Sequence, residues 1–130
     1  MKITPIKKIK EGSRGVYYEV KVNCTVLSII ILDDENGSPC SIRVQNKKGK
    51  DFSGGCVANI EAVQRLVTLL LECNIKEDLL IEQLNKVHCS SCVGRFRKGE
   101  KDIALSCAKA IAGALEKHLY NGNNETQKKE

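Results

Sequence analysis

The spacing of apolar residues changes once along this chain, and the change limits the folds that the chain can adopt. Before the glycines Gly49, Gly54 and Gly55, apolar and polar residues alternate with a period of two, which is typical of β-strands. After these glycines, apolar residues recur with a period of about 3.6, which is typical of amphipathic helices. Strands followed by helices predict an α+β domain, with an antiparallel sheet and helices packed on one of its faces.

Three strands are predicted in the first part of the chain. Residues 18–23 and 40–45 alternate between apolar and polar side chains, whereas residues 26–32 are apolar at nearly every position and rich in β-branched residues. The middle segment is therefore predicted to be the central strand, covered on both faces or packed in an interface. A hairpin turn is expected before the third strand, where Asn36 and Gly37 can adopt positive φ.

Three helices are predicted in the second part. The first begins near Cys56 and ends at Asn74, a residue tolerated in the left-handed cap conformation. A shorter helix covers residues 77–86. The last helix begins behind Ser106, a favourable N-cap residue, and runs to about residue 119.

The composition indicates one domain. A chain of 130 residues with 42% hydrophobic content can build a single core, so residues 1–120 are predicted to form one domain and residues 121–130 a disordered polar tail. No run of about 18 apolar residues is present, and no apolar segment follows the basic amino terminus. We therefore expect a cytoplasmic protein without a membrane span. In that reducing compartment its seven cysteines are thiols or metal ligands and not disulfides.

Four cysteines lie where the chain is expected to change direction: Cys24, Cys56, Cys89 and Cys107. Cys56 and Cys107 fall at predicted helix starts, where free backbone amides favour a thiolate and lower its pKa. Four converging thiolates would satisfy tetrahedral zinc, which makes zinc the predicted cofactor. An iron–sulfur cluster could use the same ligands, and four thiols without any metal are the remaining interpretation.

A fifth cysteine offers an alternative ligand. Cys89 and Cys92 form a C-x-x-C pair, a spacing that lets two thiolates reach one ion from a single turn, so Cys92 can substitute for Cys24. Cys40 lies on the apolar side of its predicted strand and is interpreted as core packing. His118, near the carboxyl end of the last helix, is assigned no further role.

These residues resemble a known family. The segments 54–56, 87–89 and 106–107, followed by a helix of small residues, are similar to the TSCPD domain, and the resemblance covers roughly residues 18–119. This domain occurs at the carboxyl end of cobalamin-dependent ribonucleotide reductases and as small free-standing proteins with four characteristic cysteines. The family's four cysteines match Cys24, Cys56, Cys89 and Cys107.

The chain departs from the family pattern after the last cysteine. Ala108 and Lys109 stand where the family has proline and aspartate, which removes a favourable first-turn proline and an acidic residue from the helix start. The reductase barrel is also absent, so only the role of the appended module is implied. The resemblance therefore predicts a metal-stabilised accessory or binding module that acts on a partner protein or a nucleotide-type ligand.

Two further classes of function remain open. The net charge is +5, and one basic cluster surrounds an aromatic residue, Phe96, so the segment could bind nucleic acid. The cluster consists of Arg95, Arg97, Lys98 and Lys101. Alternatively, Cys89 and Cys92 could pass electrons as a dithiol, and Gly54 and Gly55 could cradle an anion at a helix start. No acid–base pair, Ser-His-Asp order or phosphate loop is recognised, so no catalytic residue is predicted. The sequence leaves the partner and a homo-oligomeric state open.

Overall fold

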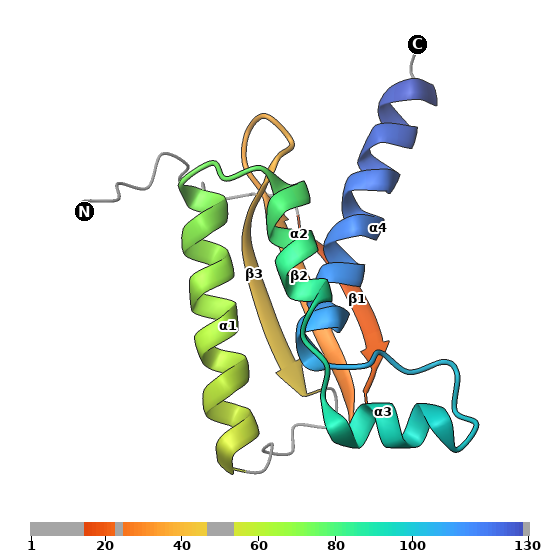
Figure 1. The fold of residues 1–130 in the computed structure, drawn as a ribbon. Helices are drawn as coiled ribbons and strands as arrows, with labels where there is room; N and C mark the ends of the chain where they lie inside the picture. The colour runs from red at the N-terminus through yellow and green to blue at the C-terminus, as the bar shows by residue number, and fades with distance from the viewer. Residues whose placement is uncertain (1–14, 23–24, 47–53, 129–130) are drawn as a thin grey trace.

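The computed structural model describes residues 15–22, 25–46 and 54–128. Three antiparallel strands are followed by four helices, which confirms the predicted α+β class (Figure 1). Cys24 lies outside the described residues. Within the described residues, no helix has both the length and the apolar content needed to cross a membrane.

The sheet is a meander in the order β1-β2-β3. Its strands are β1 (Gly15–Lys21), β2 (Val26–Asp33) and β3 (Pro39–Asn46). The pairing register places Tyr18 beside Ile29 and Ile29 beside Val44, and all three side chains are buried. The next row across the strands joins Glu19, Ser28 and Gln45 on the opposite face. The predicted alternation holds for β1 and β3, and the apolar segment 26–32 is the central strand as predicted. Helices cover only one face of this strand, and Val26, Ile30 and Leu32 lie half-buried on the other.

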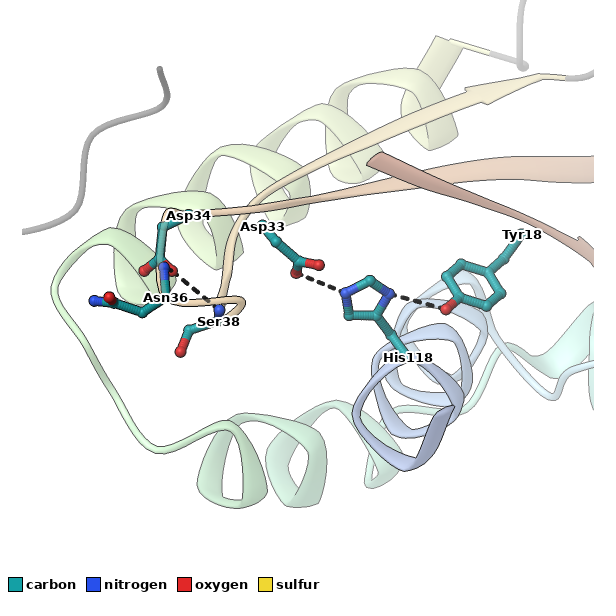
Figure 2. A network of polar contacts seen from close by, with 6 residues as sticks. All are labelled: Tyr18, Asp33, Asp34, Asn36, Ser38 and His118. Carbon is teal, nitrogen blue, oxygen red and sulfur yellow. Dashed lines mark hydrogen bonds and ion pairs between the residues drawn. The ribbon is translucent and has the colours of Figure 1, made fainter. Parts of the chain in front are cut away.

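The hairpin between β2 and β3 is held by one carboxylate. Asp34 Oδ1 accepts hydrogen bonds from the backbone amides of Asn36 at 2.9 Å and Ser38 at 3.0 Å (Figure 2). Gly37 adopts φ +80°, as predicted, whereas Asn36 does not have positive φ. The prediction for Asn36 was wrong because the Asp34 side chain supplies the turn, so only one left-handed residue is needed.

The four helices differ in one respect from the sequence prediction. They are α1 (Gly54–Glu72), α2 (Glu77–Asn85), α3 (Ser90–Arg97) and α4 (Cys107–Lys128). Helix α3 occupies a segment that was predicted to be a loop. Its eight residues carry two large apolar side chains and one glycine, too few for a helical period. Its basic residues Arg95 and Arg97 lie in the last turn, where the helix dipole favours cations.

The predicted end of α1 and the predicted start of α4 are confirmed. Asn74 adopts φ 63°, and the amide of Ile75 donates to the Leu70 carbonyl at 3.1 Å, which closes the end of α1. Ser106 caps α4, since its hydroxyl accepts a hydrogen bond from the Lys109 amide at 2.9 Å. Helix α4 continues through residues 121–128, part of the stretch for which the sequence predicts a polar tail.

The helices form a layer on one face of the sheet (Figure 1). Helix α1 packs on β3, α4 lies over β1 and β2, and α2 packs against α4. The largest fully buried side chains of these elements come from β2, β3, α1 and α4 and include Leu27, Ile29, Ile31, Ile42, Leu71, Ile111 and Leu115. Burial of this shared apolar face is the main term that stabilises the domain.

Helix α1 also closes the outer edge of β3. The Val44 amide donates to Gln64 Oε1 at 2.8 Å, and the Ile42 amide donates to Thr68 Oγ1 at 3.2 Å. The Thr68 hydroxyl lies at the same distance, 3.2 Å, from the Ile42 carbonyl oxygen. Side chains of a helix thus satisfy backbone groups that an edge strand otherwise leaves open.

Candidate functional site

The predicted cysteines gather toward one end of the domain, which we call the cysteine end. It is formed by the end of β1, the beginning of β2 and the first residues of α1, α3 and α4 (Figure 1, lower part). Cys24 lies outside the described residues, but its described neighbours Val22 and Thr25 lie at this end, joined by a 2.9 Å backbone hydrogen bond. The chain direction therefore places these junctions at one end of the domain, and a site shared by the four cysteines stays a prediction.

Ser106 joins two of the cysteine segments. Besides capping α4, its hydroxyl donates a 2.6 Å hydrogen bond to the Val87 carbonyl oxygen. The Cys89 amide in turn donates to the Leu105 carbonyl oxygen at 2.7 Å. Two crosswise hydrogen bonds thus hold the segment that carries Cys89 against the segment that carries Cys107. The buried Ser106 side chain is a positioning group that the sequence identified only as a cap.

Cys89 is the N-cap residue of α3, a helix that the sequence analysis did not predict. Its side chain is exposed and makes no capping hydrogen bond of regular geometry. The Cys92 backbone amide is the main cause that lowers the pKa of the Cys89 thiol below its ordinary value of 9.0. The Ser91 amide and the Cys92 and Ser91 side chains act in the same direction, against partial burial. Cys89 therefore has the thiolate character that a metal ligand or a nucleophile requires.

The other cysteines differ in their exposure to solvent. Cys56 is exposed near the start of α1, directly after Gly54 and Gly55, and Cys107 is half-buried as the first residue of α4, which confirms both predicted helix starts. Cys92 is 2% exposed and belongs to the apolar core. Cys40 is fully buried on β3, as predicted for a packing residue. Among the described residues, no group of three or more His, Cys, Asp or Glu side chains is arranged to hold a metal ion.

The basic cluster after Cys92 uses two of its side chains within the molecule. Arg95 Nη2 lies 2.8 Å and 2.7 Å from the two carboxylate oxygens of Glu100. This hydrogen bond lowers the pKa of Glu100 and raises that of Arg95. Lys101 Nζ lies 4.0 Å above the centre of the Phe96 ring. Arg97, Lys98 and Lys101 are exposed, and binding of a polyanion by this cluster stays a prediction.

The end of β1 anchors the same segment. Lys21 Nζ lies 3.7 Å from Glu100 and 3.9 Å from Asp102, and the Ala104 amide donates to the Lys21 carbonyl oxygen at 2.8 Å. The connection between α3 and α4 is therefore tied to the sheet through both backbone and side chains. This anchoring fixes the position from which Ser106 and Cys107 begin α4.

A second polar cluster lies away from the cysteine end. His118 of α4 is buried, with Nδ1 at 2.9 Å from the Tyr18 hydroxyl and Nε2 at 2.7 Å from Asp33 Oδ1 (Figure 2). In a neutral ring, Nε2–H donates to the Asp33 carboxylate and Nδ1 accepts from the Tyr18 hydroxyl. We call Tyr18, Asp33 and His118 the histidine network. The sequence analysis missed it because its members are 85 and 100 residues apart and belong to no motif.

A shallow hollow opens between α2 and α4. Its volume is about 500 Å³, and it is lined by Asp78, Ile81, Glu82, Asn85, Glu116, Leu119 and Tyr120. None of the site residues predicted from the sequence lines it.

The fold and its cysteine end define a small, cysteine-bearing α+β domain. A family model, the TSCPD domain, matches residues 2–119 of the chain. The protein therefore belongs to the TSCPD domain family, as the four cysteine positions predicted. No curated protein and no solved structure matches the chain.

Proposed function

We propose that this protein is a metal-binding accessory module in which Cys24, Cys56, Cys89 and Cys107 hold one zinc ion. One observation carries the proposal: two crosswise hydrogen bonds join the Cys89 and Cys107 segments at the end of the domain where α1 begins. The family gives the class of module, which resembles the domain at the carboxyl end of cobalamin-dependent ribonucleotide reductases.

The residues at this end fit the chemistry of zinc. Thiolates bind zinc at about 2.3 Å in closed, four-coordinate structural sites. Three of the four cysteines lie at or beside helix starts. The lowered pKa of Cys89 favours the thiolate form that binds metal. Zinc bound here would add its binding free energy to the stability of the fold.

In the proposed accessory role, the domain binds a partner protein or a ligand. A module of this size, with no recognised catalytic set, would act by presenting a rigid surface to a protein or by holding a nucleotide-type ligand. A reducing compartment such as the cytoplasm would keep its thiolates available for metal. The exposed Arg97 and Lys98, on the helix that follows Cys89, are the charges we assign to an anionic ligand.

Metal analysis tests the proposal most directly. Untagged protein purified without chelator should contain one zinc ion per chain, and Co²⁺ exchanged into the site should give the thiolate-to-metal absorption of a four-thiolate centre. Cys107→Ser should abolish stoichiometric binding, whereas Cys73→Ser, at the far end of α1, should leave it unchanged. Iron with labile sulfide in place of zinc would assign the site to an iron–sulfur cluster.

Thermal unfolding provides an independent measurement. Removal of a structural zinc should lower the melting temperature of the unmodified protein, and Cys107→Ser should lower it more than Cys40→Ser does in the metal-loaded state. Cys40 is fully buried, so a protein that merely packs its thiols should show the reverse order. Equal melting temperatures before and after removal of a confirmed metal would refute the structural role.

A further inference from the structure

One face of the sheet carries apolar side chains but is not covered by the described helices, which lie on the other face (Figure 1). Along the central strand of this face, which we call the open face, Val26, Ile30 and Leu32 are half-buried by their neighbours within the sheet. Leu32 extends over Gly15 of β1, where an added Cβ atom would lie 2.7 Å from Leu32 Cδ2. The open face therefore has a low apolar stripe along β2, bordered by side chains of β1 and β3.

The two borders of this stripe carry opposite charges. On β1, Tyr17 is 51% exposed, and its hydroxyl donates to Glu19 Oε1 at 2.8 Å, so the phenol and the carboxylate lie side by side. On β3, the exposed Arg43 lies in the same row as Tyr17, because Ile30 of β2 pairs with both residues. The β1 border is thus aromatic and acidic, and the β3 border is basic.

We propose that the open face is the interface of a homodimer in which two copies of the chain pack sheet against sheet. A two-fold axis parallel to β2 sets the two apolar stripes against each other and lays β1 of each copy over β3 of the second copy. Tyr17 and Glu19 then face Arg43 of the second copy, where the guanidinium stacks on the phenol and reaches the carboxylate. The symmetry forms this contact twice. The interface uses no cysteine, so the inference goes beyond the proposed metal site and does not depend on it.

The charges favour this two-fold arrangement over the other one. An axis perpendicular to the strands would lay β1 on β1 and β3 on β3, which separates Glu19 from Arg43 of the second copy and brings two arginines to the same border. Lys21, also on the open side of β1, lies 3.7 Å from Glu100 and 3.9 Å from Asp102, so its charge is balanced within the chain. Only the axis parallel to β2 joins unlike borders.

The size of the open face sets the expected strength of association. Three strands of seven to eight residues form the sheet. With strands about 4.8 Å apart and a rise of about 3.3 Å per residue, the face measures about 14 Å by 23 Å. This area is at the small end of specific interfaces, so we expect a weak and reversible dimer that is populated at about 100 µM.

Sedimentation velocity tests the association of the full-length protein as purified, with a reducing agent that prevents cysteine-linked dimers. We expect a monomer–dimer equilibrium between about 10 µM and about 1 mM. Ile30→Lys should abolish it, because the axis brings the two new charges together at the centre of the interface. Leu66→Lys is the matched control. Leu66 is 60% exposed on α1, outside the open face, so this variant should keep the dissociation constant of the parent.

Exchange of charges tests the pairing of the two borders. Glu19→Arg and Arg43→Glu should each raise the dissociation constant about tenfold, because each variant sets like charges against each other at two symmetric contacts. An equimolar mixture of the two variants should associate as the parent does, since the mixed dimer joins unlike charges again. The double variant E19R/R43E should restore the homodimer for the same reason.

A parent protein that stays monomeric at about 1 mM would overturn the proposal. A dimer that is lost in Leu66→Lys but kept in Ile30→Lys would do the same, because it would use α1 in place of the open face. Circular dichroism of each variant confirms that it is folded. If the two charge variants are folded but associate no better in the mixture than alone, the borders do not pair and the two-fold arrangement is wrong.

Discussion

The cysteine end and the histidine network stabilise the same helix, α4, in opposite ways. At the cysteine end, α4 begins through backbone hydrogen bonds around Ser106, and reactive side chains remain exposed or half-buried nearby. In the histidine network, a buried His118 side chain joins α4 to Tyr18 of β1 and Asp33 of β2. The comparison shows that backbone and hydroxyl hydrogen bonds hold the end where cysteines are exposed or half-buried, whereas buried side-chain hydrogen bonds hold the histidine network.

This difference between the two regions predicts which substitutions lower the free energy of unfolding most. The largest effect should come from His118→Ala, which removes two hydrogen bonds and leaves the Asp33 carboxylate without its ring partner. We expect the free energy of unfolding to fall by about 2–4 kcal/mol, measured by urea denaturation. Tyr18→Phe, which removes only one hydrogen bond, should cost about 1 kcal/mol.

Lys117→Ala is the control for this prediction, because Lys117 is the exposed neighbour of His118 on α4. Its effect should stay within about 0.5 kcal/mol. A His118→Ala protein no less stable than the Lys117→Ala protein would show that the histidine network adds nothing to the fold, and the comparison would fail.

Ser106→Ala should have the next largest effect. It removes the cap of α4 and leaves the Val87 carbonyl without its 2.6 Å partner, so a loss of about 1–2 kcal/mol is expected. Unlike His118→Ala, it should also weaken zinc binding, because it loosens the two cysteine segments from each other. Ser90→Ala, at an exposed position in α3, is the control. Equal zinc affinity in the parent, Ser106→Ala and Ser90→Ala proteins would show that Ser106 does not position the zinc ligands.

The smallest effect concerns the pH dependence of Cys89. Its pKa is lowered in the folded chain, so alkylation of Cys89 in metal-free protein should have a midpoint below 9.0. By linkage, the thiolate adds stability that is fully present above the unfolded thiol pKa and is lost as pH falls through the lowered pKa. The midpoint is measured by treating the protein with iodoacetamide over a series of pH values below and above 9.0 and determining the alkylated fraction of Cys89 by mass spectrometry.

Cys92→Ser sharpens the same measurement. The largest cause of the lowered pKa is the backbone amide of residue 92, which a serine retains, so the midpoint should rise only slightly. A midpoint for Cys89 at or above the ordinary value in the parent protein would contradict the N-cap geometry of α3.

The sequence was sufficient for the fold because its periodicity is local. The strands, the cap at Ser106 and the left-handed Asn74 each follow from residues within one element or turn. Helix α3 was missed because eight residues with few apolar side chains carry no period. It is held by its buried Cys92, by the hydrogen bond from the Cys89 amide to Leu105 and by the ion pair between Arg95 and Glu100. Cysteine spacing predicted a shared end, whereas the exposures of Cys89 and Cys92 depend on tertiary packing.

The histidine network illustrates a different limit. From the sequence alone, Tyr18 is interpreted as an ordinary apolar residue of a strand, and His118 as an ordinary polar residue near the end of a helix. Only the register of β1 on β2, with α4 laid across both, brings the phenol, the imidazole and the carboxylate together. A buried polar contact between distant elements leaves no periodic signal in the sequence.

The contact between α1 and the edge of β3 affects the tendency of this domain to aggregate. An open strand edge is a template on which other chains can add strands, and it is a common route to fibrils. Gln64 and Thr68 occupy this template from within, at Val44 and Ile42. Another chain can therefore pair with β3 at Ile42 and Val44 only after α1 has moved away. In the folded domain, α1 protects this edge against the addition of strands.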